Sequence, residues 1–215
     1  MARQALTRDR VLAAAIRVAD QGGVSAISMR KVAQELDVEA MSLYHHVPNK
    51  EALLDGVVDA VFTLIDLPPD APDWRDALRA RSSSARDVLS QHSWALGLLD
   101  SRRNPGSPTL THHNAVLGVL RQAGFSVALA VHAVSLLDSY VYGFVIQEAS
   151  LPSDDVEQVA GEIVEQADEL PHLKEVAAHT ARSGYSPADD FAFGLGLILD
   201  ALEARRSVAC ARGDH

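Results

Sequence analysis

Residues 28–50, which read SMRKVAQELDVEAMSLYHHVPNK, decide the fold. Val32, Ala33 and Leu36 fall on one face of a short helix, and a second apolar pattern begins after a polar break. Pro48 ends this second pattern, because proline disfavours helical backbone in the residue before it. Two helices of about two turns each are unstable alone in water, so they need a packing partner.

The apolar stretch at residues 12–19 supplies that partner. Three small helices with a sharp turn between the last two form a helix-turn-helix arrangement. In this arrangement the second of the paired helices enters the major groove of DNA. Arg30, Lys31 and Lys50 suit contact with phosphates. The pattern alone also allows a second interpretation, in which the three helices are a piece of core with a solvated polar face.

The charge is unevenly divided along the chain. Residues 1–50 carry seven Lys or Arg and five Asp or Glu, whereas residues 51–215 carry twelve and twenty-four. The net charge of −10 therefore comes from the C-terminal part. This asymmetry leaves the N-terminal part suited to DNA despite the acidic total.

The remaining sequence predicts helices and no strands. Asn49 is the expected N-cap of a fourth helix, and the proline-rich stretch at residues 67–72 is a boundary. Further helices are expected at 8–21, 73–90, 93–101, 109–122, 126–149 and 186–206, with acidic helical patches within 154–183. The expected fold is all-α, with a helix-turn-helix head at 1–48, a connecting helix at 49–66 and a helical body at 67–215.

Composition limits the cellular context. Residues 1–10 are polar and charged, so we expect no signal peptide. No uninterrupted apolar run reaches about 18 residues, so we expect no membrane span. The single cysteine, Cys210, excludes an intrachain disulfide and suits a reducing cytoplasm.

From residue 6 to residue 62 the chain resembles the tetracycline-repressor (TetR-like) family of bacterial transcription regulators. The resemblance is carried by VLAAAIRVADQGGVSAISMRKVAQELDVEAMSLYHHVPNKEALLDGVVDAVF, and above all by its GGVSAISMRKVA, SLYHHV and NKEALL segments. One position departs from the family pattern: Asp37 stands where the family usually has glycine in the turn. Aspartate tolerates left-handed backbone better than most residues, so we expect the turn to form.

The resemblance implies roles at the DNA, residue by residue. The expected contact residues are Ser28, Arg30, Glu39, Ala40, Met41, Ser42, Tyr44, His45 and Lys50. Residues 39–42 begin the reading helix, whereas Tyr44, His45 and Lys50 match positions that contact the DNA backbone. Glu39 has two interpretations: it accepts a hydrogen bond from a cytosine amine, or it favours the helix N-terminus.

Two long stretches in the body carry little charge. Residues 191–199 and 127–137 read as helices that are apolar on several sides. Either both are core, or they form a four-helix interface between two copies of the chain. The resemblance favours the second interpretation, because this family dimerises through its last long helices. A two-fold dimer places its reading helices about one DNA turn apart, so a palindromic operator is the expected partner.

The resemblance is weaker over residues 74–200, where it rests on WRDAL, QAGFS and FAFGL. It implies a small-molecule pocket, for which the candidate residues are Trp94, His113, His132, Asp138 and Tyr142. The family positions that hold histidines for tetracycline and its magnesium fall on Asp66 and Leu99. We therefore expect no tetracycline site, no metal and no other cofactor.

The expected function is that of a ligand-responsive transcriptional regulator, a repressor that binds a palindromic operator as a homodimer and is released by a small-molecule effector. The alternative is an all-α small-molecule-binding or scaffold protein without functional DNA binding. An enzyme is not expected, because the sequence offers no Ser/His/Asp arrangement, Gly-rich phosphate loop or pair of carboxylates in motif context.

Overall fold

The computed structural model describes residues 5–99, 106–150, 156–166, 169–184 and 186–212, and within these ranges it is helical with no strand. The head contains α1 (Arg8–Gly22), the 3-10 helix η1 (Val24–Ala26), α2 (Met29–Glu35), α3 (Ala40–Leu43) and the start of α4 (Lys50–Leu64). The body contains α5 (Trp74–Gln91), α6 (Trp94–Leu99), α7 (Ser107–Gln122), α8 (Val127–Glu148), α9 (Val156–Gln166), α10 (Pro171–Ser183) and α11 (Pro187–Arg212).

Side-chain caps fix the starts of the head helices. Thr7 accepts a hydrogen bond from the backbone N–H of Arg10, Ser28 from that of Lys31, and Asn49 from that of Ala52. Each cap satisfies one of the backbone donors that a helix N-terminus leaves unpaired. Short-range sequence therefore determines where α1, α2 and α4 begin.

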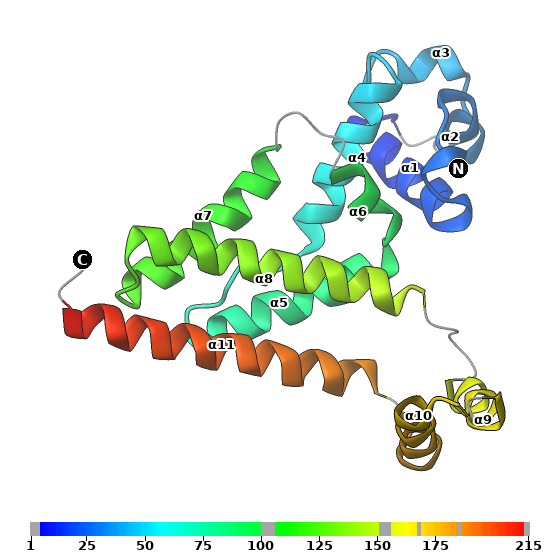
Figure 1. Cartoon of the computed structure of the whole chain (residues 1–215). Helices are drawn as coiled ribbons and strands as arrows, with labels where there is room; N and C mark the ends of the chain where they lie inside the picture. The colour runs from blue at the N-terminus through cyan, green and yellow to red at the C-terminus, as the bar shows by residue number, and fades with distance from the viewer. Residues whose placement is uncertain (1–4, 100–105, 151–155, 167–168, 185, 213–215) are drawn as a thin grey trace.

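Buried side chains form two clusters, one in the head and one in the body. The head cluster includes Val11, Ile27 and Leu43, from α1, the segment before α2, and α3. The body cluster is drawn from α4, α5, α6, α7, α8 and α11. Helix α4 belongs to both, because it places Leu53 and Val57 in the head cluster and later residues in the body cluster. Figure 1 shows α4 running from the head into the body, with α3 on the outer side of the head.

Several boundaries differ from those expected. The reading helix α3 is one turn long rather than about two. Helix α7 begins at Ser107 rather than residue 109, with Pro108 in its first turn, where a missing N–H costs nothing. Helix α11 continues to Arg212 instead of ending near residue 206. The expected break at residues 151–153 lies outside the described residues.

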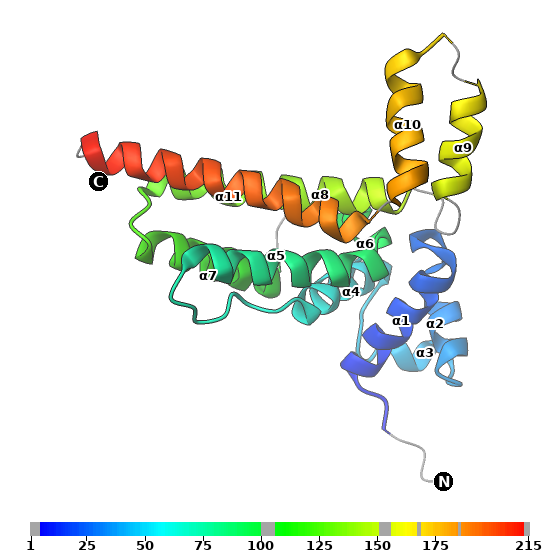
Figure 2. The ribbon, with the colours of Figure 1, turned by 90° about the horizontal axis from the view of Figure 1, so that it is seen from below.

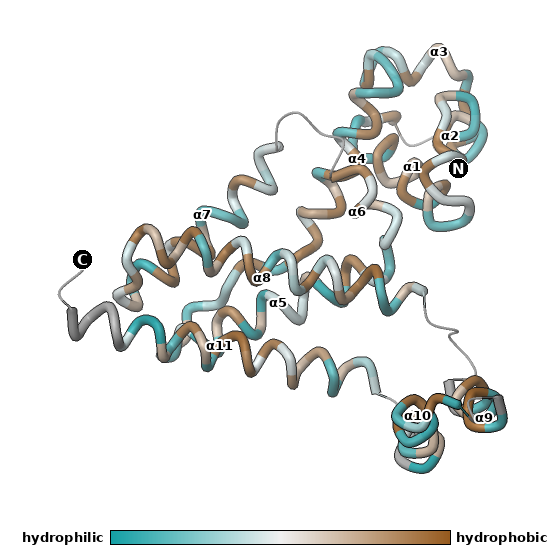
Figure 3. The backbone as a smooth tube through the Cα atoms, viewed as in Figure 1, coloured by the Kyte–Doolittle hydropathy of each residue, from teal (hydrophilic) through white to brown (hydrophobic). Residues whose placement is uncertain are grey.

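Helices α8 and α11 lie side by side along the body (Figures 1 and 2). Both leave large apolar side chains exposed. Five residues on one face of α8 are buried, among them Ala133 and Leu137. On its other faces Val127 and Ile146 are exposed, and on α11 Phe193 is 70% exposed. Figure 3 shows apolar residues along both helices. These apolar surfaces have no partner within the described chain.

By length and composition alone, α8 is also able to cross a membrane. One face of α8 packs against α5, α7 and α11 and contributes to the body core, while its other faces stay uncovered in the single chain. The sequence expectation considered only uninterrupted apolar runs, whereas polar residues, among them His132 and Asp138, interrupt the apolar residues of α8.

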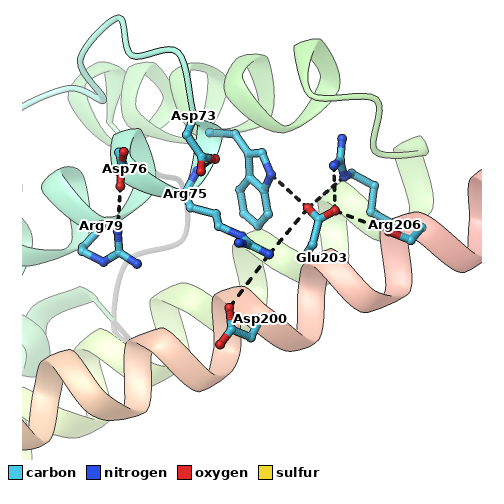
Figure 4. A network of polar contacts seen from close by, with 9 residues as sticks. Asp73, Arg75, Asp76, Arg79, Asp200, Glu203 and Arg206 are labelled. Atoms are coloured by element: carbon cyan, nitrogen blue, oxygen red, sulfur yellow. Dashed lines mark hydrogen bonds and ion pairs between the residues drawn. The ribbon is translucent and has the colours of Figure 1, made fainter.

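Polar contacts hold α11 to the start of α5 (Figure 4). Glu203 accepts hydrogen bonds from the Trp74 indole at 3.3 Å and from Arg206 at 2.7 Å, and Arg75 lies 3.9 Å away. The hydrogen bond from Arg206 is the largest cause of the lowered pKa of Glu203. This network fixes the register of α11 against the body.

Helices α9 and α10 form a hairpin that projects from the end of the body (Figure 2). The two helices pack mainly on each other, and Ala160 of α9 and Ala177 of α10 are buried. Leu173 and Val176 on α10 remain exposed.

Candidate nucleic-acid interface and body cavity

The turn between α2 and α3 is tight because Asp37 adopts left-handed backbone. Its φ is 53°, and it is the only non-glycine residue with positive φ in the described part of the chain. The N–H of Val38 returns to the carbonyl of Ala33 at 3.0 Å, which closes the end of α2. The expectation that aspartate allows the turn is confirmed.

Buried residues anchor α3 while its other side chains face solvent. Leu43 and Val47 are buried in the head core, and Met41 is 73% exposed. Tyr44, which follows α3 directly, is 44% exposed. The α3 region therefore presents Met41 and Tyr44 to solvent while Leu43 and Val47 hold it to the head core.

The nine predicted DNA-contact residues occupy the starts of α2 and α4 and the α3 region. Ser28, Ala40 and Ser42 are half-buried, and the hydroxyl of Ser28 caps α2. Glu39 is the N-cap residue of α3 but makes no side-chain cap hydrogen bond. The exposed members of the set are Arg30, Glu39, Met41, Tyr44, His45 and Lys50.

Two sets of hydrogen bonds link the head and the connecting helix to the body. Asp20, at the end of α1, accepts from the Trp94 indole at 2.8 Å and lies 2.7 Å from Nδ1 of His92. His112 of α7 bonds through Nε2 to the carbonyl oxygen of Phe62 in α4 at 3.0 Å. A carbonyl can only accept, so this ring nitrogen carries the hydrogen. This hydrogen bond joins α7 directly to α4, and the two helices also pack against each other.

A cavity of about 620 Å³ opens between α7 and α8. Its lining residues are Leu99, Thr109, His113, Leu117, Val131, Val134, Ser135, Asp138, Ser139 and Tyr142. A volume of this size lies within the range of small-molecule sites. His113 lines the cavity directly after His112, so the cavity wall and the α4 contact share one turn of α7.

A buried ion pair supports the polar side of this cavity. Nη1 of Arg81 lies 3.2 Å from Oδ1 of Asp138, and the side chain of Arg81 is only 3% exposed. The other carboxylate oxygen lies 3.0 Å from Nε2 of His113. Burial raises the pKa of the Tyr142 hydroxyl, and the nearby Asp138 carboxylate raises it further, so this hydroxyl keeps its hydrogen. Burial, followed by the Arg81 charge, lowers the pKa of His112.

The structure brings three of the five candidate ligand residues together. His113, Asp138 and Tyr142 line the cavity. Trp94 instead packs between the two cores and bonds to Asp20, and His132 is exposed outside the cavity lining. Neighbours in sequence can face opposite sides of a helix, and this separates His132 from the cavity.

Sequence reasoning missed Arg81 and Thr109. Arg81 lies on the apolar face of α5, among Trp74, Leu78 and Ala85, and this position was the available signal. A charged residue on a buried face needs a partner, which here is Asp138. Of the two positions that carry drug-binding histidines in the resembled family, Leu99 lines the cavity and Asp66 bonds to Ser84 instead.

Two family models match the chain. The model described as "Bacterial regulatory proteins, tetR family" matches residues 11–57, and the model described as "Tetracyclin repressor-like, C-terminal domain" matches residues 67–206. The chain belongs to the tetR family of bacterial regulatory proteins. This TetR-family protein is a ligand-responsive, DNA-binding transcriptional regulator, as the resemblance predicted.

Named relatives agree with this assignment. The HTH-type transcriptional repressor DrrR1 of Streptomyces coeruleorubidus is 34% identical, with 97% of this chain and 81% of the relative covered. The class A tetracycline repressor from transposon 1721 of Escherichia coli is also 34% identical, over 94% of this chain and 93% of its own length. These relatives are transcriptional regulators rather than enzymes.

Solved structures share the whole architecture. ActR of Streptomyces coelicolor in complex with actinorhodin has 27% identity and a TM-score of 0.76, covering 94% of this chain and 99% of its own. BioQ with its double-stranded DNA operator has 26% identity and a TM-score of 0.65, covering 93% of this chain and 99% of its own. A second similar structure is that of BioQ from Mycobacterium smegmatis, with a TM-score of 0.68.

Proposed function

We propose that this protein is a cytoplasmic repressor that binds a palindromic operator as a homodimer, and that a small molecule in the body cavity releases it. The observation that carries the proposal is the shared turn of α7, in which His113 lines the cavity and His112 holds the carbonyl of Phe62. A ligand that prefers one position of α7 shifts the connecting helix and with it the head.

The division of the chain supports this mechanism. We assign residues 1–48 to the DNA-binding head, 49–66 to the connecting helix and 67–215 to the ligand-binding and dimerisation body. The two buried clusters agree with this division, because α4 is the element that contributes substantially to both. A rigid helix shared by two cores transmits a displacement from one to the other.

Roles in the head follow from exposure and chemistry. Arg30 and Lys50 are exposed cations for phosphate, and the hydroxyl of the exposed Tyr44 donates to a phosphate oxygen. Met41 and Ser42 lie on the reading helix and face the base edges in this docking. Phosphate contacts set affinity for every sequence, whereas base contacts set sequence choice.

Dimerisation uses the uncovered apolar surfaces of α8 and α11. Val127, Ile146 and Phe193 are examples of large side chains left in water by a single chain. A two-fold arrangement covers the same patch on both copies. It also presents two α3 helices to one face of the duplex, as a palindromic site requires.

The relatives support the two ligands of this proposal. ActR has been solved with actinorhodin and BioQ with its operator, and both share the fold of this chain. For this chain the effector differs from a magnesium–tetracycline complex, because Asp66 and Leu99 stand at the positions of the histidines.

The test is selection of bound sequences from a random pool of double-stranded DNA in low salt. We expect a two-fold symmetric motif. Tyr44→Ala is expected to weaken binding to all sequences about tenfold without changing the motif, whereas substitutions at residues 39–42 change the motif itself. Failure to enrich any sequence would refute the proposal in favour of a binding or scaffold protein without functional DNA binding.

A further inference from the structure

The body cavity has an apolar side and a polar side. Leu99, Leu117, Val131 and Val134 provide the apolar side. The polar side consists of Thr109 and His113 on α7 and of Ser135, Asp138, Ser139 and Tyr142 on α8. A ligand that fills this space therefore needs an apolar body with polar groups along one edge.

Asp138 determines which hydrogen-bonding group His113 offers to the cavity. The carboxylate of Asp138 only accepts, so Nε2 of His113, at 3.0 Å, donates to it. In the neutral ring the second nitrogen, Nδ1, then carries a lone pair and accepts. The part of the chain that the structure describes provides no partner for Nδ1, and the side chain is 37% exposed at the cavity.

A second polar group on the same face of α7 lacks a partner. The Oγ1 atom of Thr109 is buried without a hydrogen bond within the described chain, and the residue is only 6% exposed. Thr109 lies four residues before His113, so the two side chains are neighbours on the helix surface. A buried hydroxyl without a partner costs free energy unless a ligand or water satisfies it.

The charges near the cavity are already balanced. Arg81 and Asp138 neutralise each other at 3.2 Å, and Arg81 stands behind the lining rather than in it. Among the described lining residues there is no Lys or Arg, and the one charged group is the carboxylate of Asp138, which repels an anion. A cation competes with Arg81 for the same carboxylate. Both kinds of ion are therefore disfavoured relative to a neutral molecule.

We infer that the cavity selects a neutral, largely apolar molecule that carries a hydroxyl group, with the hydroxyl donating to Nδ1 of His113. Thr109 provides a second hydrogen-bonding group one turn away. The inference rests on the proposed function only in that it treats this cavity as the effector site.

Three fluorescent probes with the same fused-ring body test the inference: 1-hydroxypyrene, 1-methoxypyrene and pyrene-1-carboxylate. The first donates a hydrogen bond, the second only accepts, and the third is an anion. At pH 7.5 we expect the full-length protein to bind the hydroxyl probe about tenfold more tightly than either other probe, which is the net value of one hydrogen bond formed in place of a bond to water. Equal or tighter binding of the methoxy or carboxylate probe, or no binding of any probe, overturns the inference.

Two variants identify the group responsible. His113→Phe is expected to bring the hydroxyl and methoxy affinities to a ratio near one, while the exposed His172→Phe keeps the wild-type ratio. Asp138→Asn offers His113 an amide donor, which moves the ring hydrogen to Nδ1. Because hydroxyl and methoxy oxygens both accept from this N–H, the ratio of the two affinities should fall toward one. Circular dichroism checks that His113→Phe is folded. If the folded variant keeps the wild-type ratio of hydroxyl to methoxy affinity, His113 is not the acceptor.

A parallel DNA-binding titration separates this inference from the proposed function. Hydroxyl-selective binding without release of operator DNA supports the ligand class and contradicts the regulatory proposal. Release of DNA by all three probes at equal concentrations supports the regulatory proposal and contradicts the ligand class.

Discussion

The head and the body obtain their folding stability from different kinds of contact. The head is complete in itself: short helices are capped by their own neighbours, and Val11, Ile27 and Leu43 are fully buried among them. The body leaves large apolar side chains of α8 and α11 in water and buries a guanidinium and an imidazole inside. The difference shows that the head depends on local sequence, whereas the body depends on a second copy and on long-range polar pairs.

The largest effect is expected where the body depends on its partner. Leu197→Glu places a charge on the uncovered surface of α11, where Leu197 is 56% exposed in one chain. We expect monomers, and a loss of operator affinity of about 100-fold, because one head no longer gains from the binding of the other. Sedimentation velocity and a DNA titration measure the two effects.

The matched control is Leu110→Glu on α7, where the side chain is exposed to a similar extent, 53%. It should leave the dimer intact. A dimeric Leu197→Glu protein with normal operator affinity would show that α11 does not form the interface.

The next effect concerns the internal pair of the body. Asp138→Ala leaves the Arg81 guanidinium, 3% exposed, without its carboxylate, and we expect a loss of about 3 kcal/mol of stability. Urea unfolding at fixed protein concentration measures it. The double variant Arg81→Met with Asp138→Leu should recover most of the loss, because it removes both charges together. An equally unstable double variant would mean that shape rather than charge is responsible.

A smaller effect is expected in the head. Ser28→Ala removes the hydroxyl that caps α2 and should cost about 1 kcal/mol. Ser25, exposed in η1, provides the control, because Ser25→Ala removes a similar hydroxyl without removing this cap. Chemical denaturation followed by circular dichroism compares the two. Equal stability of both variants would argue against the local origin of head stability.

These expectations reflect how far sequence alone determined the structure. Thr7, Ser28 and Asn49 act on neighbours within three residues, so the starts of α1, α2 and α4 were predictable to within a residue or two. Asp37 in the turn was predictable for the same reason. The one-turn length of α3 was not, because the residues after Leu43 leave the helix to place Val47 in the core.

The cavity was only partly predictable. The polar residues His113, Asp138 and Tyr142 stood out within apolar stretches, and they meet in the structure. Arg81, the ion-pair partner of Asp138, precedes it by 57 residues, so no local sequence pattern connects the two. Trp94 was predicted to line the pocket as an aromatic residue, and the structure places it against both buried clusters.

The smallest effect concerns pH. Burial, and after it the Arg81 charge, lowers the pKa of His112 below the ordinary 6.5, while Asp138 acts in the opposite direction and His113 adds to the lowering. Below about pH 6.5 the unfolded chain therefore binds more protons at this position than the folded chain, and the stability from His112 is lost as pH falls. We expect His112→Gln to flatten the fall in urea midpoint between pH 7.5 and 5.5, whereas His172→Gln does not. A variant with the wild-type pH dependence would exclude His112 as the source.

The joint at Asp20 gives the molecule a built-in optical reporter. The chain has two tryptophans, and Trp94 donates its indole hydrogen to the head while Trp74 donates to Glu203 within the body. Replacing Trp74 by phenylalanine leaves one emitter whose hydrogen-bond partner belongs to α1. Its emission wavelength then follows the separation of α1 from α6 in solution, with no label attached, while DNA or effector is added.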